Sequence, residues 1–446
     1  MQLKVDTHSL QKPIISFFQL TLLSSCILFT LAVNAQWTQV GNDIDGEAPL
    51  DRSGCAVSMP DSNTVAIGAY NNDGSKGHVR VYSRISSTWI QKGNDIDGEV
   101  IGDWSGRSVS MPDANTLAIG APWNQGNGQK SGHVRIYRWS GAAWTQKGND
   151  IDGEAAYDES GRSVSMPDTN TVAIGAPYNN GNGNHAGHVR IYEWIGNTWI
   201  KKGGDIDGEA ADDLSGFSVS MPDANTIAIG ALQNDGNGAN AGHVRIYQWL
   251  GASWVQKGSD IDGEAAGDRS GTSVSMPDAN TVAIGAPNNY GNGTDAGHVR
   301  VYQWSGSAWV QKGIDIDGNI ENRSGIVSMP YKNVVAIGAP YGSANGHGIW
   351  SGQVRIYSFN TITRVNETES IVNGLKLYPN PTKDNFRLEL NQLSEKNLLQ
   401  VFDLQGKLIH QQDVSRLIKK INTQNWKAGV YFVRYGEHMK KLVILE

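Results

Sequence analysis

The sequence predicts an all-β protein, a six-bladed β-propeller closed by its N-terminal strand and followed by a small C-terminal β-sandwich. Tryptophan recurs at six equivalent positions with spacings of 52, 55, 55, 55 and 55 residues: Trp37, Trp89, Trp144, Trp199, Trp254 and Trp309. Each interval holds four short segments rich in β-branched and aromatic residues with turn residues between them, which indicates four strands per repeat. With 53 Gly and 18% charged residues among 446, the composition excludes a coiled coil.

Residues 1–35 have the organisation of a signal peptide. Lys4 and Lys12 precede an apolar run from about Ile14 to Val33, and the small residues Val33 and Ala35 occupy the positions that a signal peptidase requires. A membrane anchor is the competing interpretation, because the run approaches the roughly 20 residues that span a bilayer. Polar residues interrupt the run and no basic flank follows it, so we expect no transmembrane span in the mature chain.

The composition of the remaining chain limits its chemistry. Removal of residues 1–35 leaves Cys55 as the single cysteine, so no intrachain disulfide is expected in an exported protein. The chain carries a formal net charge of −7, and the excess of acidic residues lies in residues 36–360. An acidic body argues against nucleic acid as a partner.

Residues 36–360 form the repeat region. In the repeat that begins at Trp254, the expected strands are Trp254–Gly258, Thr272–Met276, Thr281–Gly285 and His298–Trp304, with a tight turn over Pro277–Asn280. Repeats of four strands and about 50 residues are typical of propellers, and a linear solenoid is the alternative. The ends of the array favour closure, because the strand Trp37–Gly41 lacks a preceding triplet and the final triplet lacks a following tryptophan strand.

Three motifs of each repeat resemble the FG-GAP repeats of integrin α-subunit propellers. They are the segments Ser273–Met276, Thr281–Pro287 and Gly297–Tyr302 in the fifth repeat. The Gly-Ala-Pro element itself recurs at Gly120, Gly175, Gly285 and Gly338. The resemblance implies a propeller, although integrin propellers have seven blades. The calcium loop of that family lies where this chain has only a short turn, so its metal site is not transferred to this sequence.

A different acidic loop follows the tryptophan strand in the first five repeats. It reads Asp-Ile-Asp-Gly-Glu with a further Asp four residues beyond the Glu. Carboxylates at alternate positions of a curled loop could supply oxygen ligands to Ca²⁺. The candidate ligands are Asp43, Asp45, Glu47, Asp51, Asp95, Asp97, Glu99, Asp103, Asp150, Asp152, Glu154, Asp158, Asp205, Asp207, Glu209, Asp213, Asp260, Asp262, Glu264 and Asp268.

Turn chemistry is the alternative interpretation of these loops. Asp and Gly are turn formers whose side chains and conformations suit tight loops. The loop also lacks the Glu at position 12 that completes an EF-hand site. The sixth loop, with Asp315, Asp317 and Asn319, is expected to bind calcium poorly or not at all.

The third strand of each triplet carries an Arg, and in five repeats a His stands two positions before it. We expect the Arg residues to form ion pairs or stacking contacts between blades, because guanidinium suits bidentate contacts. The His residues face the same side as the Arg by strand alternation, and packing explains them more simply than a ring of metal ligands. The positions are His78, His133, His188, His243 and His298 with Arg80, Arg135, Arg190, Arg245, Arg300 and Arg355.

The sequence shows no constellation typical of an enzyme. Ser, His and Asp recur in register in nearly every repeat, so none is singled out as a nucleophile or base. The loops after the Gly-Ala-Pro element vary and carry aromatic and Asn side chains, which could stack on sugars or contact peptide surfaces. A solvated turn is the competing explanation. The candidate ligand-binding residues are Trp123, Tyr178, Tyr290, Tyr341 and Trp350.

A polar linker, residues 361–374, leads to a second domain over residues 375–446. Its alternating segments predict a small sandwich of some seven strands. Four ordered motifs resemble the C-terminal sorting domain of the type IX secretion system of Bacteroidota, which implies export across the outer membrane by that machinery. The motif residues are Tyr378, Pro379, Asn380, Pro381, Gly406, Lys407, Gly429, Tyr431, Lys440 and Lys441.

Together these features predict an exported, non-enzymatic propeller, either secreted or held at the outer-membrane surface. Its expected partners are the type IX secretion machinery and an extracellular glycan or protein, contacted through several similar weak sites. Two alternatives are a structural component of the surface layer and an exported enzyme that degrades polysaccharide or protein. Calcium is the one cofactor that the sequence suggests.

Overall fold

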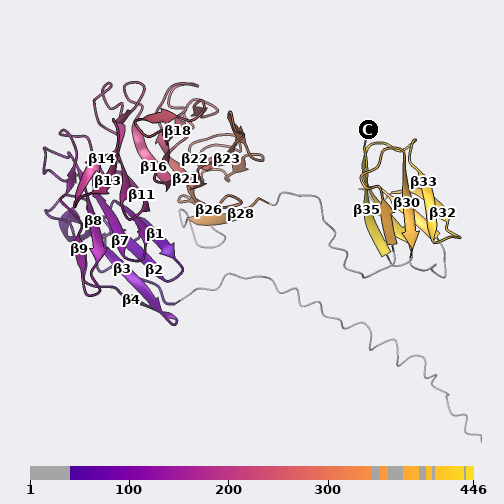
Figure 1. Cartoon of the computed structure of the whole chain (residues 1–446), viewed down its shortest axis with the longest axis horizontal. Helices are drawn as coiled ribbons and strands as arrows, with labels where there is room; N and C mark the ends of the chain where they lie inside the picture. The colour runs from indigo at the N-terminus through magenta and orange to yellow at the C-terminus, as the bar shows by residue number, and fades with distance from the viewer. Residues whose placement is uncertain are drawn as a thin grey trace, which may run out of the picture. The chain divides into compact units, whose positions relative to one another are not determined.

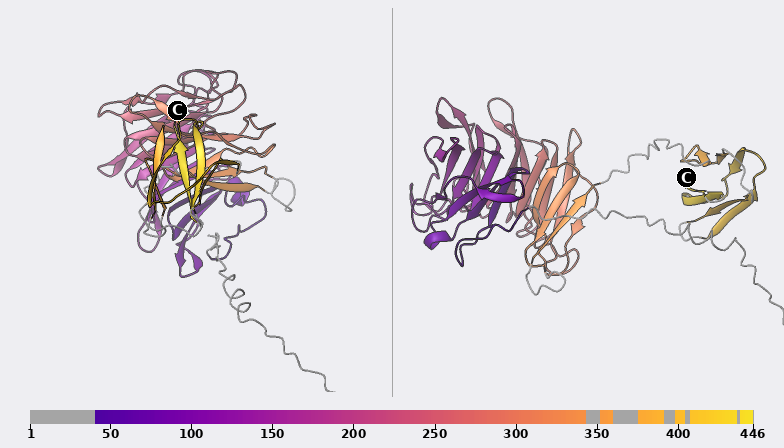
Figure 2. Two further views of the ribbon diagram at one scale, coloured as in Figure 1. Left: turned by 90° about the vertical axis from the view of Figure 1, so that its right-hand side faces the viewer. Right: turned by 90° about the horizontal axis from the view of Figure 1, so that it is seen from below.

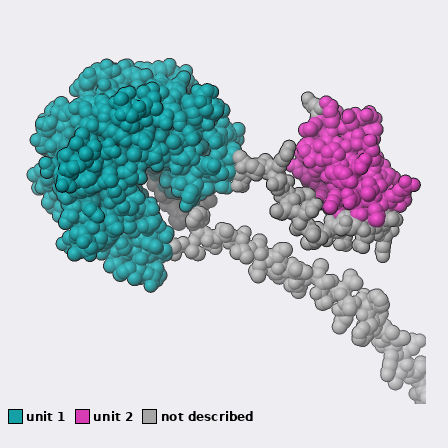
Figure 3. Space-filling view, viewed as in Figure 1, with its two compact units in different colours: residues 1–359 teal, residues 360–446 magenta. Residues whose placement is uncertain are grey.

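The computed structural model describes residues 41–342, 352–359, 375–390, 398–403, 407–435 and 438–445. The chain divides into two compact units, Met1–Phe359 and Asn360–Glu446 (Figure 3). Apart from the four-residue helix α1 (Asn72–Ser75), the regular structure of the described residues consists of strands, which confirms the all-β prediction. None of the described residues forms a helix long and apolar enough to cross a membrane.

The first unit contains six antiparallel sheets, numbered here in chain order. Sheet 1 contains β1 (Ala56–Asp61), β2 (Thr64–Ala69), β3 (His78–Ile85), β4 (Thr88–Gln91) and β5 (Ile96–Asp97). Sheet 2 contains β6 (Ser108–Asp113), β7 (Thr116–Ala121), β8 (His133–Trp139), β9 (Trp144–Gln146) and β10 (Ile151–Asp152). Sheet 3 contains β11 (Ser163–Asp168), β12 (Thr171–Ala176), β13 (His188–Ile195), β14 (Thr198–Lys201) and β15 (Ile206–Asp207).

The remaining sheets of this unit repeat the pattern. Sheet 4 contains β16 (Ser215–Asp223), β17 (Thr226–Ala231), β18 (His243–Trp249), β19 (Trp254–Gln256) and β20 (Ile261–Asp262). Sheet 5 contains β21 (Ser273–Asp278), β22 (Thr281–Ala286), β23 (His298–Trp304), β24 (Trp309–Gln311) and β25 (Ile316–Asp317). Sheet 6 contains β26 (Ile326–Tyr331), β27 (Val334–Ala339) and β28 (Gln353–Ser358).

Strand pairing confirms that the tryptophan strand completes the triplet before it. In sheet 4, β16, β17, β18 and β19 are hydrogen-bonded neighbours in that order. The short strand β20, which the sequence analysis does not predict, pairs with the start of β18 through the partners Asp262 and His243. The second strands of sheets 2 to 5, such as β17, are buried along their whole length because their apolar residues meet a neighbouring sheet on each face.

The turn expected over Pro277–Asn280 is shorter in the structure. Strand β21 continues through Pro277 to Asp278, and β22 begins at Thr281. A register shift between Ser275 and Asp278 accommodates the proline, which has no N–H to donate to the ladder. Proline therefore marks a bulge near the end of the inner strand and not the turn itself.

Successive sheets pack face to face, and this packing forms the core of the first unit. Val79 and Val81 of β3 contact a layer formed by Met111, Leu117 and Ile119 of sheet 2. Equivalent layers lie at the following junctions. The inner strands also contact one another in turn, from β1 on β6 to β21 on β26 (Figures 1 and 2). This is the arrangement of propeller blades.

The two ends of the series expose the faces that the other sheets bury. In β1, Met59 is 56% exposed, whereas its counterpart Met111 in β6 is 6% exposed. At the other end, Val354 of β28 is 69% exposed. Within the described residues β28 pairs only with β27, and of the predicted closing strand Trp37–Gly41 only Gly41 is described.

The second unit confirms the small β-sandwich. One sheet has the order β29 (Leu375–Tyr378), β30 (Asn385–Leu390) and β33 (Ile418–Asn422). The other has the order β32 (Leu408–Asp413), β31 (Leu398–Phe402), β34 (Gly429–Tyr435) and β35 (His438–Ile444). Side chains from both sheets, including Phe386, Leu399 and Tyr435, form one buried apolar cluster between them.

Candidate functional site

Five clusters of one His, one Glu and one Asp recur at the junctions between successive repeats. In the first cluster, Nδ1 of His78 lies 3.7 Å from Oε2 of Glu47 and 3.6 Å from Oδ2 of Asp95. In each cluster the three ligand atoms lie within 4.8 Å of one another. The clusters are Glu47, His78, Asp95; Glu99, His133, Asp150; Glu154, His188, Asp205; Glu209, His243, Asp260; and Glu264, His298, Asp315.

Three elements position the side chains of each cluster. His78 is the first residue of β3 and pairs with Asp97 of β5 in the sheet. Asp95 lies two residues before Asp97, so the pairing of β5 with β3 brings it to the histidine. Glu47 belongs to the loop that precedes β1 of the same sheet. Each cluster therefore combines the acidic loops of two successive repeats.

An arginine fixes the glutamate of each cluster. Nη1 of Arg245 lies 3.6 Å from Oε1 of Glu209, and Nη2 donates a hydrogen bond of 2.6 Å to the carbonyl oxygen of Asp207. The guanidinium also lies 5.6 Å from the ring centroid of Tyr247. Equivalent contacts to a glutamate and a loop carbonyl are made by Arg80, Arg135, Arg190 and Arg300. These arginines thus make the ion-pair and stacking contacts that the sequence suggested.

The histidines of the clusters are buried. The His243 side chain is 1% exposed, and neither of its ring nitrogens has a hydrogen-bond partner. Burial, reinforced by the charge of the neighbouring Arg, lowers the pKa of His133, His188 and His243 to about 4, and the same causes lower that of His298. The imidazoles of these four histidines are therefore unprotonated at neutral pH.

The structure distributes the four carboxylates of each acidic loop among different roles. The first and the Glu, such as Asp95 and Glu99, belong to two different clusters. The fourth, Asp103, is buried and accepts hydrogen bonds from the backbone N–H groups of Glu99 and Val100 and from Nδ2 of Asn124. Asp51, Asp158, Asp213 and Asp268 make equivalent contacts within their loops.

The second carboxylate residue of each loop contributes its backbone to the arginine contact. The carbonyl oxygens of Asp45, Asp97, Asp152, Asp207 and Asp262 accept these hydrogen bonds. Among the described residues, the groups of three or more potential ligands contain the Glu and the first Asp but neither the second nor the fourth carboxylate. The sequence did not predict which carboxylates join a cluster. The two that meet, such as Glu47 and Asp95, belong to different repeats and lie far apart along the chain.

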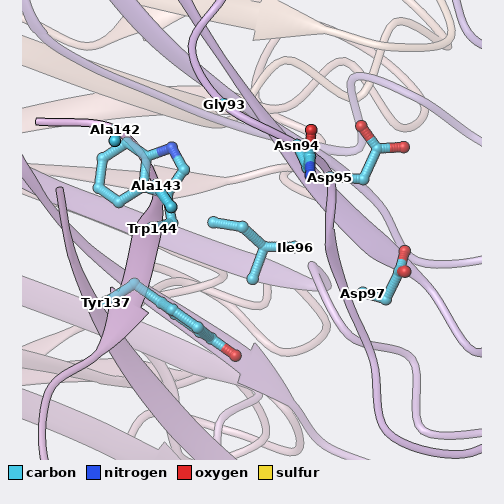
Figure 4. Close-up of a pocket in the computed structure, with 9 residues that line it drawn as sticks. All are labelled: Gly93, Asn94, Asp95, Ile96, Asp97, Tyr137, Ala142, Ala143 and Trp144. Atoms are coloured by element: carbon cyan, nitrogen blue, oxygen red, sulfur yellow. The ribbon is translucent and has the colours of Figure 1, made fainter. Parts of the chain in front are cut away.

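A hollow of about 350 Å³ adjoins the first cluster, between sheets 1 and 2. Its lining includes Asp95, Asp97, Tyr137 and Trp144. Figure 4 shows Ile96 on the side of the two aromatic rings, while the carboxylates of Asp95 and Asp97 point the other way. The alternation of side chains along β5 therefore separates the apolar packing from the acidic cluster.

The aromatic residues of the loops after the second strands differ in accessibility. Trp123 stacks on Trp104 with ring centroids 3.5 Å apart, and Nζ of Lys130 lies 3.7 Å from the Trp123 centroid. Two groups this close must cover opposite faces of the indole, which leaves no free face for a ligand. Tyr290 is 54% exposed and Tyr341 is 41% exposed.

The other two aromatic candidates have different outcomes. Tyr178 is half-buried and packs edge-on against His185. Trp350 lies outside the described residues. The sequence did not predict the stacking of Trp104 on Trp123. Trp104 lies in the acidic loop and Trp123 in the loop after the second strand, which are different parts of the repeat.

The sorting-motif residues of the second unit are partly brought together. The Asn380 side chain donates a 2.8 Å hydrogen bond to the carbonyl oxygen of Lys441 and accepts one of 2.9 Å from the N–H of Val443. The first motif is thus joined to the last strand. Tyr378, Pro379, Pro381, Lys407 and Gly429 are exposed, Tyr431 is buried, Lys440 is half-buried, and Gly406 lies outside the described residues.

Comparisons with solved structures give distant likenesses to propellers. One is PorZ, described as an essential bacterial surface component of the type IX secretion system of Porphyromonas gingivalis, at 12% identity and a TM-score of 0.40, covering 91% of this chain and 61% of PorZ. Another is the β-propeller domain of the Trilobed protease from Pyrococcus furiosus, at 10% identity and a TM-score of 0.39, covering 87% of this chain and 96% of that domain. Neither likeness bears on function. A search of curated proteins gave no match.

One protein family matches the C-terminal unit. Residues 376–445 fit the family described as the secretion system C-terminal sorting domain. These residues include the strands β30 to β35 and the motif residues from Tyr378 to Lys441. The C-terminal unit therefore belongs to the family of type IX secretion sorting domains, and the protein is exported to the cell surface or released beyond it.

Proposed function

We propose that this protein is a non-enzymatic binding protein that recognises an extracellular glycan or protein through the loops after the second strands. Export supports the proposal, because the sorting domain directs the chain to the cell exterior. Repetition supports it as well, since the groups of three or more potential metal ligands among the described residues occur in five similar copies. A ring of similar sites suits multivalent contact better than a single reaction centre.

The observation that carries the proposal is a common loop framework that presents different exposed side chains. In sheet 2, Oδ1 of Asn124 accepts a 2.8 Å hydrogen bond from the N–H of Gly126. Nδ2 of Asn127 donates a 2.8 Å bond to the carbonyl oxygen of Gly153 in the next repeat. Sheets 3, 4 and 5 have the same pair of bonds.

One position of this framework varies while remaining exposed. In each loop one residue stands between the Asn residues that make the two repeated hydrogen bonds, and its side chain is exposed. The four residues, in sheets 2 to 5, are Gln125, Asn180, Asp235 and Tyr290. Fixed backbone with variable exposed side chains is how recognition loops are built on rigid scaffolds. Tyrosine is an effective contact residue, because it offers a large amphipathic ring at low cost in conformational entropy.

Glycan-array binding of the labelled full chain tests the proposal. We expect binding to a restricted set of glycans, and Tyr290→Ala should weaken it by about tenfold or more, the loss typical of an aromatic contact residue. Tyr331→Ala is the matched control, because Tyr331 is 71% exposed but ends an inner strand at the other end of a sheet.

The outcomes of the array separate the alternatives. Equal loss with Tyr290→Ala and Tyr331→Ala would contradict the assignment of these loops. Release of shortened glycans during incubation would contradict a non-enzymatic function. If no glycan binds, the same variants are tested by surface plasmon resonance against extracellular matrix and host-surface proteins, and absence of binding there would leave the proposal without support.

A further inference from the structure

We propose that the five His, Glu and Asp clusters are binding sites for a divalent transition-metal ion, with Zn²⁺ as the best fit. Each ion would join the acidic loops of two successive repeats. This assignment differs from a calcium site within a single loop. It is independent of the ligand that the loops after the second strands recognise.

The distances within the clusters fit metal ligation better than hydrogen bonding. In four clusters Nδ1 of the His lies between 3.5 and 3.9 Å from an oxygen of both the Glu and the Asp, and in the fifth Nδ1 of His188 lies 3.9 Å from Glu154. Hydrogen bonds between such atoms are about 2.7 to 3.2 Å long. Ligand atoms that surround Zn²⁺ at about 2.0 to 2.2 Å in a tetrahedron lie roughly 3.3 to 3.6 Å apart. The clusters are close to that spacing.

A second observation is the unpartnered buried imidazole. His243 is 1% exposed, its two ring nitrogens have no hydrogen-bond partner, and Nδ1 lies 3.8 Å from both Glu209 and Asp260. Nε2 is likewise buried without a partner in His78, His133, His188 and His298. A buried polar group without a partner is costly. In the His243 cluster, a metal ion on Nδ1 would satisfy the unpartnered nitrogen that faces the carboxylates.

The donor set selects the class of ion. Imidazole nitrogen together with carboxylate oxygen suits Zn²⁺ and neighbouring transition metals, whereas Ca²⁺ takes oxygen ligands. Three protein ligands leave one tetrahedral position for water or for a donor of an incoming ligand. An entry path exists, because the Glu209 and Asp260 side chains are 43% and 30% exposed.

The charges around each cluster also favour a cation. Glu209 and Asp260 contribute two carboxylates, while Arg245 contributes one positive charge through the other oxygen of Glu209. One negative charge remains without a counterion inside the cluster. Arg245 contacts Oε1 of the glutamate, so that Oε2 faces the imidazole.

The sixth repeat supplies a natural comparison. Gln353 occupies the position of the histidine and Asn319 that of the glutamate. Loss of both ligands in the same repeat is expected if they serve one ion, and it predicts five sites per chain. The substitution also shows that glutamine is compatible with this position at the start of a third strand, since Gln353 begins β28.

Metal counting on the full chain tests the proposal. The protein is stripped with EDTA, exchanged into buffer and titrated with ZnCl₂ by calorimetry, and native mass spectrometry counts the bound ions. We expect five Zn²⁺ per chain. His243→Gln and, separately, Glu209→Gln should each leave four. With Co²⁺ in place of Zn²⁺, visible d–d bands should appear, and either variant should lower their intensity by about one fifth, because one of five sites is lost.

Controls make the count decisive. His185→Gln, which removes an exposed histidine outside the clusters, should still bind five ions. Thermal unfolding measures whether each variant is folded. If His243→Gln does not fold, the ion count of Glu209→Gln tests the proposal. The proposal is overturned if both variants bind as many ions as the parent, if Zn²⁺ does not bind, or if Ca²⁺ binds in its place.

Discussion

In this protein, one buried side chain can contact residues that lie far apart in the sequence. His78, for example, faces Glu47 on one side and Asp95 on the other, and these carboxylates come from two different acidic loops. Arg80 on the same strand holds Glu47 through its other oxygen. The role of each acidic residue therefore depends on the side chain opposite it and not on its place in the Asp-Ile-Asp-Gly-Glu motif.

Acidification is expected to destabilise the metal-free protein between about pH 6.5 and pH 5. Burial lowers the pKa of His243 in the folded state to about 4, against 6.5 for an exposed histidine, with Arg245 adding to the effect and Asp260, Asp213 and Glu209 opposing it. The unfolded chain then binds more protons than the folded one in this range. Stability is complete above pH 6.5 and falls as pH decreases toward the folded-state value.

Differential scanning calorimetry in EDTA measures this dependence. The melting temperature should fall steadily below pH 6.5, before carboxylates begin to protonate at lower pH. His243→Gln should reduce the slope, because one of the buried histidines is absent. An unchanged melting temperature from pH 7 to pH 5 would contradict the neutral, buried state of these histidines.

At the scale of the elements, the glycine of the Gly-Ala-Pro motif lies where two neighbouring sheets come closest together. Gly175 in β12 lies against the carbonyl group of Gly216 in the next sheet, so close that a Cβ there would overlap that carbonyl oxygen. Gly120 and Gly285 have the same relation to Gly161 and Gly325. The glycine is thus required because backbone from the following repeat occupies the place of a side chain.

Gly175→Ala is expected to lower the free energy of unfolding by about 3 kcal/mol, because the new methyl group forces two packed sheets apart. Gly204→Ala is the matched control, since a Cβ at Gly204 would meet no atom within 4 Å and its φ is not positive. Urea unfolding followed by tryptophan fluorescence measures both. A similar change for the two variants would contradict the proposed close approach.

At the scale of the whole molecule, the last sheet of the first unit shows three strands among the described residues, β26, β27 and β28. In the earlier sheets a tryptophan of the fourth strand donates its Nε1–H to a lysine carbonyl of the preceding sheet, as Trp309 does to Lys257 at 2.7 Å. The equivalent place beside Lys312 is an apolar hollow of about 270 Å³, lined in part by Met329 and Phe359. The repeat pattern assigns Trp37 to this place.

Trp37→Ala is therefore expected to destabilise the first unit by about 2 to 4 kcal/mol, as removal of a large packed aromatic side chain does. Thr38→Ala, at the adjacent position, should change stability by less than about 0.5 kcal/mol. Chemical denaturation of the full chain compares the two. Equal stability of Trp37→Ala and the parent would show that this residue does not complete the sixth sheet.

Much of the fold follows from local patterns. The spacing of the tryptophans, the apolar second strands and the turn residues predicted the repeated sheets, because each blade is built from neighbouring segments of the chain. The Tyr378 to Pro381 and Lys440 to Val443 motifs identified the sorting domain, since that recognition depends on short sequences. The bulge at Pro277 was not predicted, because a register shift depends on the partner strand.

The sequence by itself determined the number of repeats, four of the strands in a repeat, the acidic loops and the sorting motifs. Only the tertiary structure decided which carboxylates meet. The pairing of β5 with β3 carries Asp95 to His78, and the packing of the loops adds Glu47. It also decided that Trp123 is covered by Trp104 while Tyr290 is exposed. These outcomes depend on contacts between segments tens of residues apart, which no local pattern records.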